Sequence, residues 1–173
     1  HSAEIAKRGA SKSYSVASVL SKCFVVGDNE ETNKNVRAMV TAYQKEYLTK
    51  DGLLTKFQSY IDFCAQNTQF PSKKLKASLQ DMQWKMGYVD LDTGTQKGTL
   101  NEVLGVSSKD DESKLRGKRA VLIAIEEFGS FPNLLGLYGT LRPSVEEGDI
   151  VYGLIYMQGT AGDDDSDFAS AQE

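Results

Sequence analysis

Hydrophobic residues recur every three or four positions along several stretches of this chain, a spacing that predicts amphipathic helices. One such stretch covers residues 13–22. Another follows Asp51, which we expect to cap its helix at the N-terminus. The other helices predicted in this way are one from a cap at Asn29 or Thr32 to about Leu48, one from Pro71 to Leu79, and one that opens near Pro132.

Other stretches are continuously apolar or alternate strictly between polar and apolar residues, which predicts strands. Residues 120–125 form the longest apolar run, as in a strand buried on both faces. Residues 23–26 and 150–158 are further apolar candidates, and the alternating stretch 82–91 leads through a turn to 100–106, which predicts a hairpin. Helices that alternate with strands predict an α/β fold with a mostly parallel sheet, here with an added antiparallel hairpin.

The composition is that of an ordinary globular domain, and it argues against several kinds of site. The 173 residues are 40% hydrophobic and 25% charged, which suits one domain with a buried core. A formal net charge of −4 argues against a uniformly basic surface for nucleic acid. The single histidine, His1, argues against a histidine-based triad, and two cysteines are too few for a zinc cluster. No apolar run is long enough to span a membrane.

The segment from Ala6 to Ser13 carries a partial phosphate-binding (Walker A) motif, Ala-Lys-Arg-Gly-Ala-Ser-Lys-Ser. The full motif, G-x-x-x-x-G-K-[ST], surrounds phosphates with backbone N–H groups at a helix N-terminus. Its lysine contacts the β- and γ-phosphates, and its hydroxyl binds Mg²⁺. Lys12 and Ser13 match the motif, but Ala6 and Ser11 replace its two glycines. The alternative interpretation is a small-residue turn with Ser13 as the N-cap of the next helix.

Two adjacent carboxylates, Glu126 and Glu127, directly follow the apolar run 120–125, as in a Walker B motif. In this arrangement the first carboxylate holds Mg²⁺ beside the hydroxyl of the phosphate loop, and the second polarises the attacking water. The alternative is a charged pair at the surface end of a strand. The position favours a site, because open α/β sheets bind ligands at the carboxyl ends of their strands.

The last predicted strand ends in small and hydroxyl residues, Gly159, Thr160, Ala161 and Gly162. In motor ATPases such a strand end senses the γ-phosphate and relays its loss. A strand followed by a plain Gly-rich turn is the alternative.

Two runs of like charge have less specific interpretations. The basic run from Lys114 to Arg119 holds four cations in six residues, and it suits either a DNA backbone or a solvated strand entrance. The acidic run from Asp163 to Asp167 is interpreted as a solvated loop rather than a nuclease metal cluster.

Taken in order along the chain, these motifs resemble the large terminase subunit of tailed bacteriophages, the ATPase motor that packages DNA into the procapsid. The resemblance rests on residues 7–13, on residues 158–163 and, most specifically, on the stretch from Leu115 to Leu135. It implies a P-loop α/β fold of the ASCE (RecA-like) type, in which the catalytic glutamate adjoins Walker B. Terminases often lack the first glycine of the loop and place an arginine four residues before its lysine, where Arg8 stands.

The resemblance also implies a role for each matched position. It makes Lys12 the contact to the β- and γ-phosphates, and it places Ser13 and Glu126 on Mg²⁺. It makes Glu127 the catalytic carboxylate, Arg8 a cis-acting arginine on the γ-phosphate side, and Thr160 part of the motif that couples hydrolysis to DNA movement. The nucleotide-binding loop implied in this way consists of Arg8, Gly9, Ala10, Ser11, Lys12 and Ser13.

As a terminase-like protein, the chain is expected to use ATP and Mg²⁺ and to act on double-stranded DNA without regard to sequence. The resemblance further implies a portal protein and a small terminase subunit as partners, a homo-oligomeric ring, and assembly in the host cytoplasm. Residues 1–173 are expected to form an ATPase domain fragment that does not include the C-terminal nuclease. Two alternatives stay open: another P-loop NTPase such as a helicase, and a P-loop-like assembly module that has lost hydrolysis.

Overall fold

A seven-stranded sheet forms the centre of the molecule in a computed structural model that describes residues 1–5, 11–27, 35–70, 72–111 and 115–160. The first five strands in the sheet order run parallel to one another, and the last two are antiparallel to their neighbours. The predicted α/β class with a mostly parallel sheet is therefore confirmed. In spatial order the strands are β1 (Ser2–Ile5), β11 (Leu154–Gly159), β8 (Leu122–Glu126), β2 (Arg37–Ala42), β7 (Glu102–Ser107), β4 (Gln83–Met86) and β3 (Lys74–Ser78).

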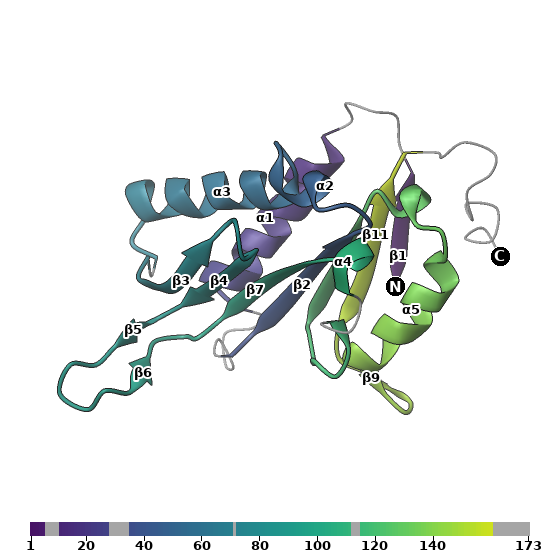
Figure 1. Cartoon of the computed structure of the whole chain (residues 1–173). Coiled ribbons are helices and arrows are strands. Elements are labelled where there is room, and N and C mark those ends of the chain that lie inside the picture. The colour runs from purple at the N-terminus through teal and green to yellow at the C-terminus, as the bar shows by residue number, and fades with distance from the viewer. Residues whose placement is uncertain (6–10, 28–34, 71, 112–114, 161–173) are drawn as a thin grey trace.

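Helices cover both faces of this sheet (Figure 1). The helices α1 (Lys12–Val25) and α3 (Leu53–Asn67) pack on one face, and α5 (Leu134–Leu141) packs on the other. Short helical turns join the larger elements: α2 (Glu46–Thr49), α4 (Ser108–Asp111), η2 (Phe128–Ser130) and η3 (Arg142–Ser144). None of the helices in the described ranges has the length and apolar composition needed to cross a membrane.

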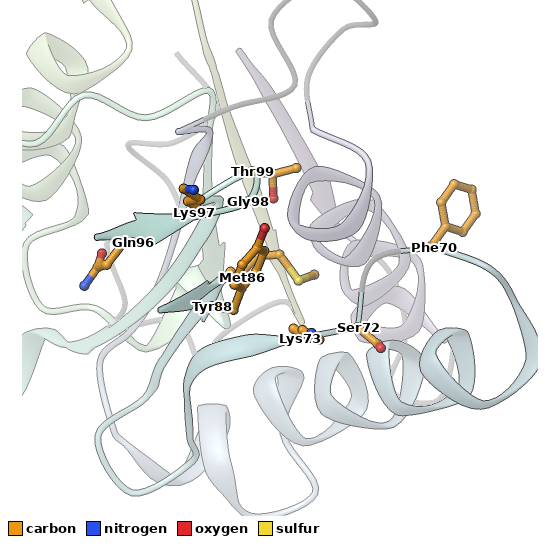
Figure 2. A pocket seen from close by; sticks show the side chains of 10 residues that line it. Phe70, Ser72, Lys73, Met86, Tyr88, Gln96, Lys97, Gly98 and Thr99 are labelled. Carbon is orange, nitrogen blue, oxygen red and sulfur yellow. The ribbon is translucent and has the colours of Figure 1, made fainter. Parts of the chain in front are cut away.

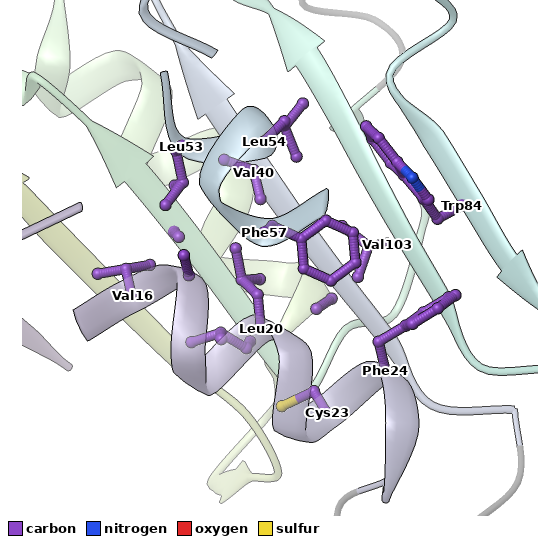
Figure 3. Packing of buried hydrophobic residues seen from close by; sticks show 14 of the residues in the cluster. Val16, Leu20, Cys23, Phe24, Val40, Leu53, Leu54, Phe57, Trp84 and Val103 are labelled. Carbon is purple, nitrogen blue, oxygen red and sulfur yellow. The ribbon is translucent and has the colours of Figure 1, made fainter. Parts of the chain in front are cut away.

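Three aromatic side chains pack among aliphatic ones in the layer between the sheet and the helix pair α1 and α3 (Figure 3). The ring of Phe57 on α3 meets the rings of Phe24 and Trp84 edge-on, with centroids 5.5 and 5.3 Å apart. The Trp84 indole N–H donates to the side-chain oxygen of Gln58, so its polar atom is satisfied inside the core. This layer anchors α1, whose N-terminus begins the candidate site.

The strand β8 shows why the run 120–125 is continuously apolar. Leu122 and Ala124 pack into the layer beneath α1, whereas Ile123 and Ile125 pack into the layer beneath α5. Both faces of the strand are therefore buried, as its sequence predicts. The strand ends at Glu126, which is buried although its side chain is a carboxyl group.

The predicted hairpin is confirmed. The strands β4 and β7 pair antiparallel, and the chain between them forms a ribbon of β5 (Tyr88–Val89) and β6 (Gln96–Lys97) that projects from the sheet (Figure 1). A second small ribbon, β9 (Glu146–Glu147) with β10 (Ile150–Val151), precedes β11.

Three predicted elements are wrong. Residues 23–26, predicted as a strand, are instead the end of α1 and its C-cap Val26, and the apolar side chains of Cys23, Phe24 and Val25 are buried in the core from this helix. Within the helix predicted over 29–48, residues 37–42 instead form β2, whose burial between β7 and β8 overrides the helical propensity of its alanines and methionine. The last part of that prediction agrees with the structure, since residues 46–48 begin the short helix α2. The helix predicted over 71–79 is the edge strand β3, in which Ala77 pairs with Trp84 of β4.

Candidate functional site

The carboxyl ends of β8 and β11 meet the N-terminus of α1 at one edge of the sheet. In the sheet order β11 lies between β1, which leads toward the phosphate-loop motif, and β8, which carries the two glutamates. Because these strands are parallel, their carboxyl ends share one edge. Arg8, Gly9 and Ala10, which the sequence assigns to the loop, lie outside the described residues.

The structure brings Ser13 and Glu126 into direct contact. The Ser13 hydroxyl donates a hydrogen bond of 2.6 Å to Oε1 of Glu126, although 113 positions separate the two residues in the sequence. A hydroxyl and a carboxylate oxygen are the hard oxygen ligands that Mg²⁺ prefers. The two residues predicted to hold Mg²⁺ therefore fit that ion by chemistry and by position.

Ser11, rather than Ser13, is the N-cap of α1, so the alternative interpretation of Ser13 as the cap is wrong. Ser11 has φ 57° and ψ 17°, the left-handed conformation that glycine adopts without strain, and its side chain makes no capping bond. The backbone at this position thus takes a conformation suited to the glycine that the motif normally has. Lys12 is the first residue of α1 and is 9% exposed.

The second oxygen of Glu126 is held by a residue that the sequence motifs did not single out for a role. The side-chain amide of Gln158 donates to Oε2 of Glu126, and the two residues are register partners on β11 and β8. Gln158 is 1% exposed, and its Oε1 has no hydrogen-bond partner in the described part of the chain. One sequence signal could have identified Gln158: it is a polar residue near the carboxyl end of a mostly apolar strand.

Burial raises the pKa of Glu126 above its ordinary value. The hydrogen bonds from Ser13 and Gln158 oppose this shift, and the negative charge of Glu127 adds to it. The pKa remains raised because desolvation is the largest of these effects. A cation at this carboxylate would favour its charged form, so the electrostatics suit a metal ligand.

Glu127 contacts Thr160, which the sequence singles out in a separate motif. Oε2 of Glu127 accepts hydrogen bonds from the backbone N–H and the hydroxyl of Thr160, both at 3.0 Å. A Cβ at Gly159 would lie 3.1 Å from the backbone nitrogen of Phe128, so a small residue there favours the close approach of the two strand ends. Each carboxylate of the pair is thus held by a different residue at the end of β11.

A separate hollow of about 860 Å³ lies at the base of the β5–β6 ribbon (Figure 2). Its lining includes Lys97 and Phe70, and the Lys73 ammonium lies 5.1 Å from the centre of the Tyr88 ring. Among the described residues, the lining has no carboxylate and none of those predicted for the phosphate site. The candidate chemistry is therefore at the carboxyl edge of the sheet and not in this hollow.

Comparison with solved structures places the fold. The chain superposes on the large terminase of bacteriophage HK97 with a TM-score of 0.62 and 15% identity over 99% of this chain and 31% of that one. It superposes on the large terminase ATPase domain of Thermus phage P74-26 with a TM-score of 0.60 and 13% identity, over 91% of this chain and 59% of that domain. A large terminase from a thermophilic bacteriophage, solved in complex with ADP, gives a TM-score of 0.55 at 10% identity, covering 91% of this chain and 32% of that one.

These similarities show a terminase-like ATPase fold. No protein-family model matches the sequence, and no curated protein sequence matches it. The chain spans less than two thirds of each of these solved proteins.

Proposed function

We propose that this chain is the ATP-hydrolysing motor domain of a phage DNA-packaging terminase. The contact between Ser13 and Glu126 carries the proposal, since it joins the helix after the phosphate-loop motif to the carboxylates after a buried strand. The terminase-like fold and the ADP complex of one structural neighbour support a nucleotide site at this edge. Residues 1–173 act in this proposal as the ATPase portion of the motor.

Each residue has one task in the proposed site. The backbone of residues 8–13 and the Lys12 ammonium bind the phosphates of ATP, with Arg8 on the γ-phosphate side. Ser13 and Glu126 hold Mg²⁺, which neutralises charge on the β- and γ-phosphates when it is bound.

Glu127 orients the water that attacks the γ-phosphorus while the bond to the bridging oxygen of ADP breaks. To orient the water, the Glu127 carboxylate has to face the water and not Thr160, with which it forms two hydrogen bonds in the structure. If Glu127 exchanges its hydrogen bonds with Thr160 for one with the water in each cycle, the position of the β11 end depends on the state of the nucleotide. Thr160 thereby couples hydrolysis to movement of DNA.

The proposed motor acts on double-stranded DNA through its phosphate backbone, without reading sequence. With a net charge of −4, the chain by itself is expected to bind DNA weakly and in a salt-sensitive way. A portal protein, a small terminase subunit and further copies of the chain in a ring complete the proposed assembly, in the host cytoplasm.

An assembly module without hydrolysis is the second candidate, and the serine in place of the second loop glycine favours it. The two candidates differ in ATP turnover, which we expect of the motor and not of the assembly module. We predict that Glu127→Gln binds ATP nearly as well as the wild type but loses turnover by about 100- to 10,000-fold, the usual contribution of a general base. Glu147→Gln, which changes an exposed glutamate paired with Arg119, is the matched control.

Single-turnover release of phosphate, with protein in excess of ATP, measures this difference. The motor proposal expects the wild type and Glu147→Gln to release phosphate at similar rates, and Glu127→Gln to release it about 100- to 10,000-fold more slowly. Release by Glu127→Gln at the wild-type rate would remove the catalytic role of Glu127. ATP binding without any release from the wild type would favour the assembly module.

A further inference from the structure

A buried amide stands between two acidic side chains at the carboxyl edge of the sheet. Gln158 on β11 is the register partner of Glu4 on β1 and of Glu126 on β8. Register partners in neighbouring strands point to the same face of a sheet. Glu4 accepts a hydrogen bond from the hydroxyl of Tyr156, which is two residues before Gln158 on the same strand face.

Fold stability alone does not account for an amide at this position. Gln158 is 1% exposed, and its Oε1 has no hydrogen-bond partner among the described residues. A buried acceptor without a partner destabilises a fold, and an apolar side chain of the same length would avoid that cost. What the amide provides is a donor, and Glu126 is the group that receives it.

The two donors on Glu126 specify its orientation. Ser13 binds one carboxylate oxygen and Gln158 binds the other, so a single rotamer satisfies both contacts. Ser13 is itself assigned to Mg²⁺, whereas Gln158 comes from a different element and contacts the other carboxylate oxygen. Partners that orient a ligating carboxylate commonly contribute 10- to 100-fold to metal affinity.

We propose that Gln158 is a positioning residue that holds Glu126 in the orientation required to bind Mg²⁺ together with Ser13. The inference rests on the proposed function, because it completes the same Mg²⁺-ATP site. In this inference the end of β11 contacts both carboxylates: Gln158 orients Glu126, and Thr160 binds Glu127.

The test is a Mg²⁺ titration of ATP binding to the full chain, for the wild type and three variants. Gln158→Met removes the donor at similar length, and Gln158→Asn retains an amide with a shorter reach. Tyr156 lies on the same face of β11 as Gln158, and Tyr156→Phe is the matched control, since it removes a hydrogen bond to the Glu4 carboxylate on β1 and no hydrogen bond to Glu126.

Gln158→Met is expected to need about 10- to 100-fold more Mg²⁺ for half-maximal ATP binding. Its ATP affinity in EDTA should match the wild type, because Lys12 and the loop are unchanged. Gln158→Asn should lose less, and Tyr156→Phe should titrate like the wild type.

A Mg²⁺ midpoint in Gln158→Met equal to that of the wild type would overturn the inference and leave the proposed function standing. An equal loss of ATP binding in EDTA would also overturn it, since a purely structural role has that effect. If circular dichroism shows Gln158→Met unfolded, an unchanged midpoint in Gln158→Asn overturns the inference. A wild type without Mg²⁺-dependent ATP binding would overturn the proposed function, and this inference with it.

Discussion

Two residues of the candidate site, Ser11 and Glu127, have left-handed backbones, with φ of 57° and 49°. One precedes the lysine of the phosphate loop, and the other follows the end of β8. Residues other than glycine pay about 1–3 kcal/mol for such conformations, and they persist where the surrounding structure requires them. The local strain at both positions therefore coincides with the residues assigned to phosphate binding and to catalysis.

Ser11 offers a direct test of this strain. Ser11→Gly removes the Cβ that opposes φ 57° and is expected to raise the free energy of unfolding by about 1 kcal/mol. Ser11→Ala keeps the Cβ, and Ser11 makes no side-chain cap that alanine would lose, so this control should match the wild type. Urea denaturation measures the free energy of unfolding of both variants. The affinity for ATP should rise several-fold in Ser11→Gly and stay unchanged in Ser11→Ala. Equal stabilities of Ser11→Gly and Ser11→Ala would argue against strain at this position.

At the scale of elements, the helix α3 packs against the core through one of its faces. Phe57 is fully buried between Phe24 and Trp84, whereas Phe63 on the same helix is 62% exposed. The helical spacing after Asp51 predicts this buried face. The packing of α3 against α1 stabilises the helix whose N-terminus carries Lys12 and Ser13.

Phe57→Ala is expected to lower the free energy of unfolding by about 3–5 kcal/mol, because the aromatic contacts are lost and a cavity remains. Phe63→Ala removes the same side chain from the exposed face and should change it by no more than about 0.5 kcal/mol. Chemical denaturation of the two variants measures both values. A similar loss in both would contradict the packing described for α3.

Sequence patterns predicted the elements whose burial is encoded in their own residues. The run 120–125 gave β8 because both of its faces are buried, and periodicity gave α1 and α3. The strand β2 was missed because its alanines and methionine have high helical propensity, and only its place between β7 and β8 specifies a strand. The contact between Gln158 and Glu126 was missed because it depends on the register between β11 and β8.

At the scale of the whole molecule, the sheet order joins motifs that are distant in the chain. The strand β11 lies between β1 and β8, so the helix that follows β1 meets the carboxylates at the end of β8. The motif order in the sequence predicted that Lys12, Ser13, Glu126 and Glu127 serve one site. The contact between Ser13 and Glu126 and the terminase-like fold agree with that hypothesis, and nucleotide binding is its central claim.

Isothermal titration calorimetry with ATP and Mg²⁺ tests that claim most directly, on the wild type, Lys12→Ala and Lys22→Ala. Lys22 is an exposed lysine in the last turn of α1, so its variant removes the same charge from the opposite end of the same helix. The account predicts that the wild type and Lys22→Ala bind with equal affinity. It predicts that Lys12→Ala binds about 10- to 100-fold more weakly, the cost of a lost charged hydrogen bond. Equal binding by wild type and Lys12→Ala, or no binding by the wild type, would contradict the account.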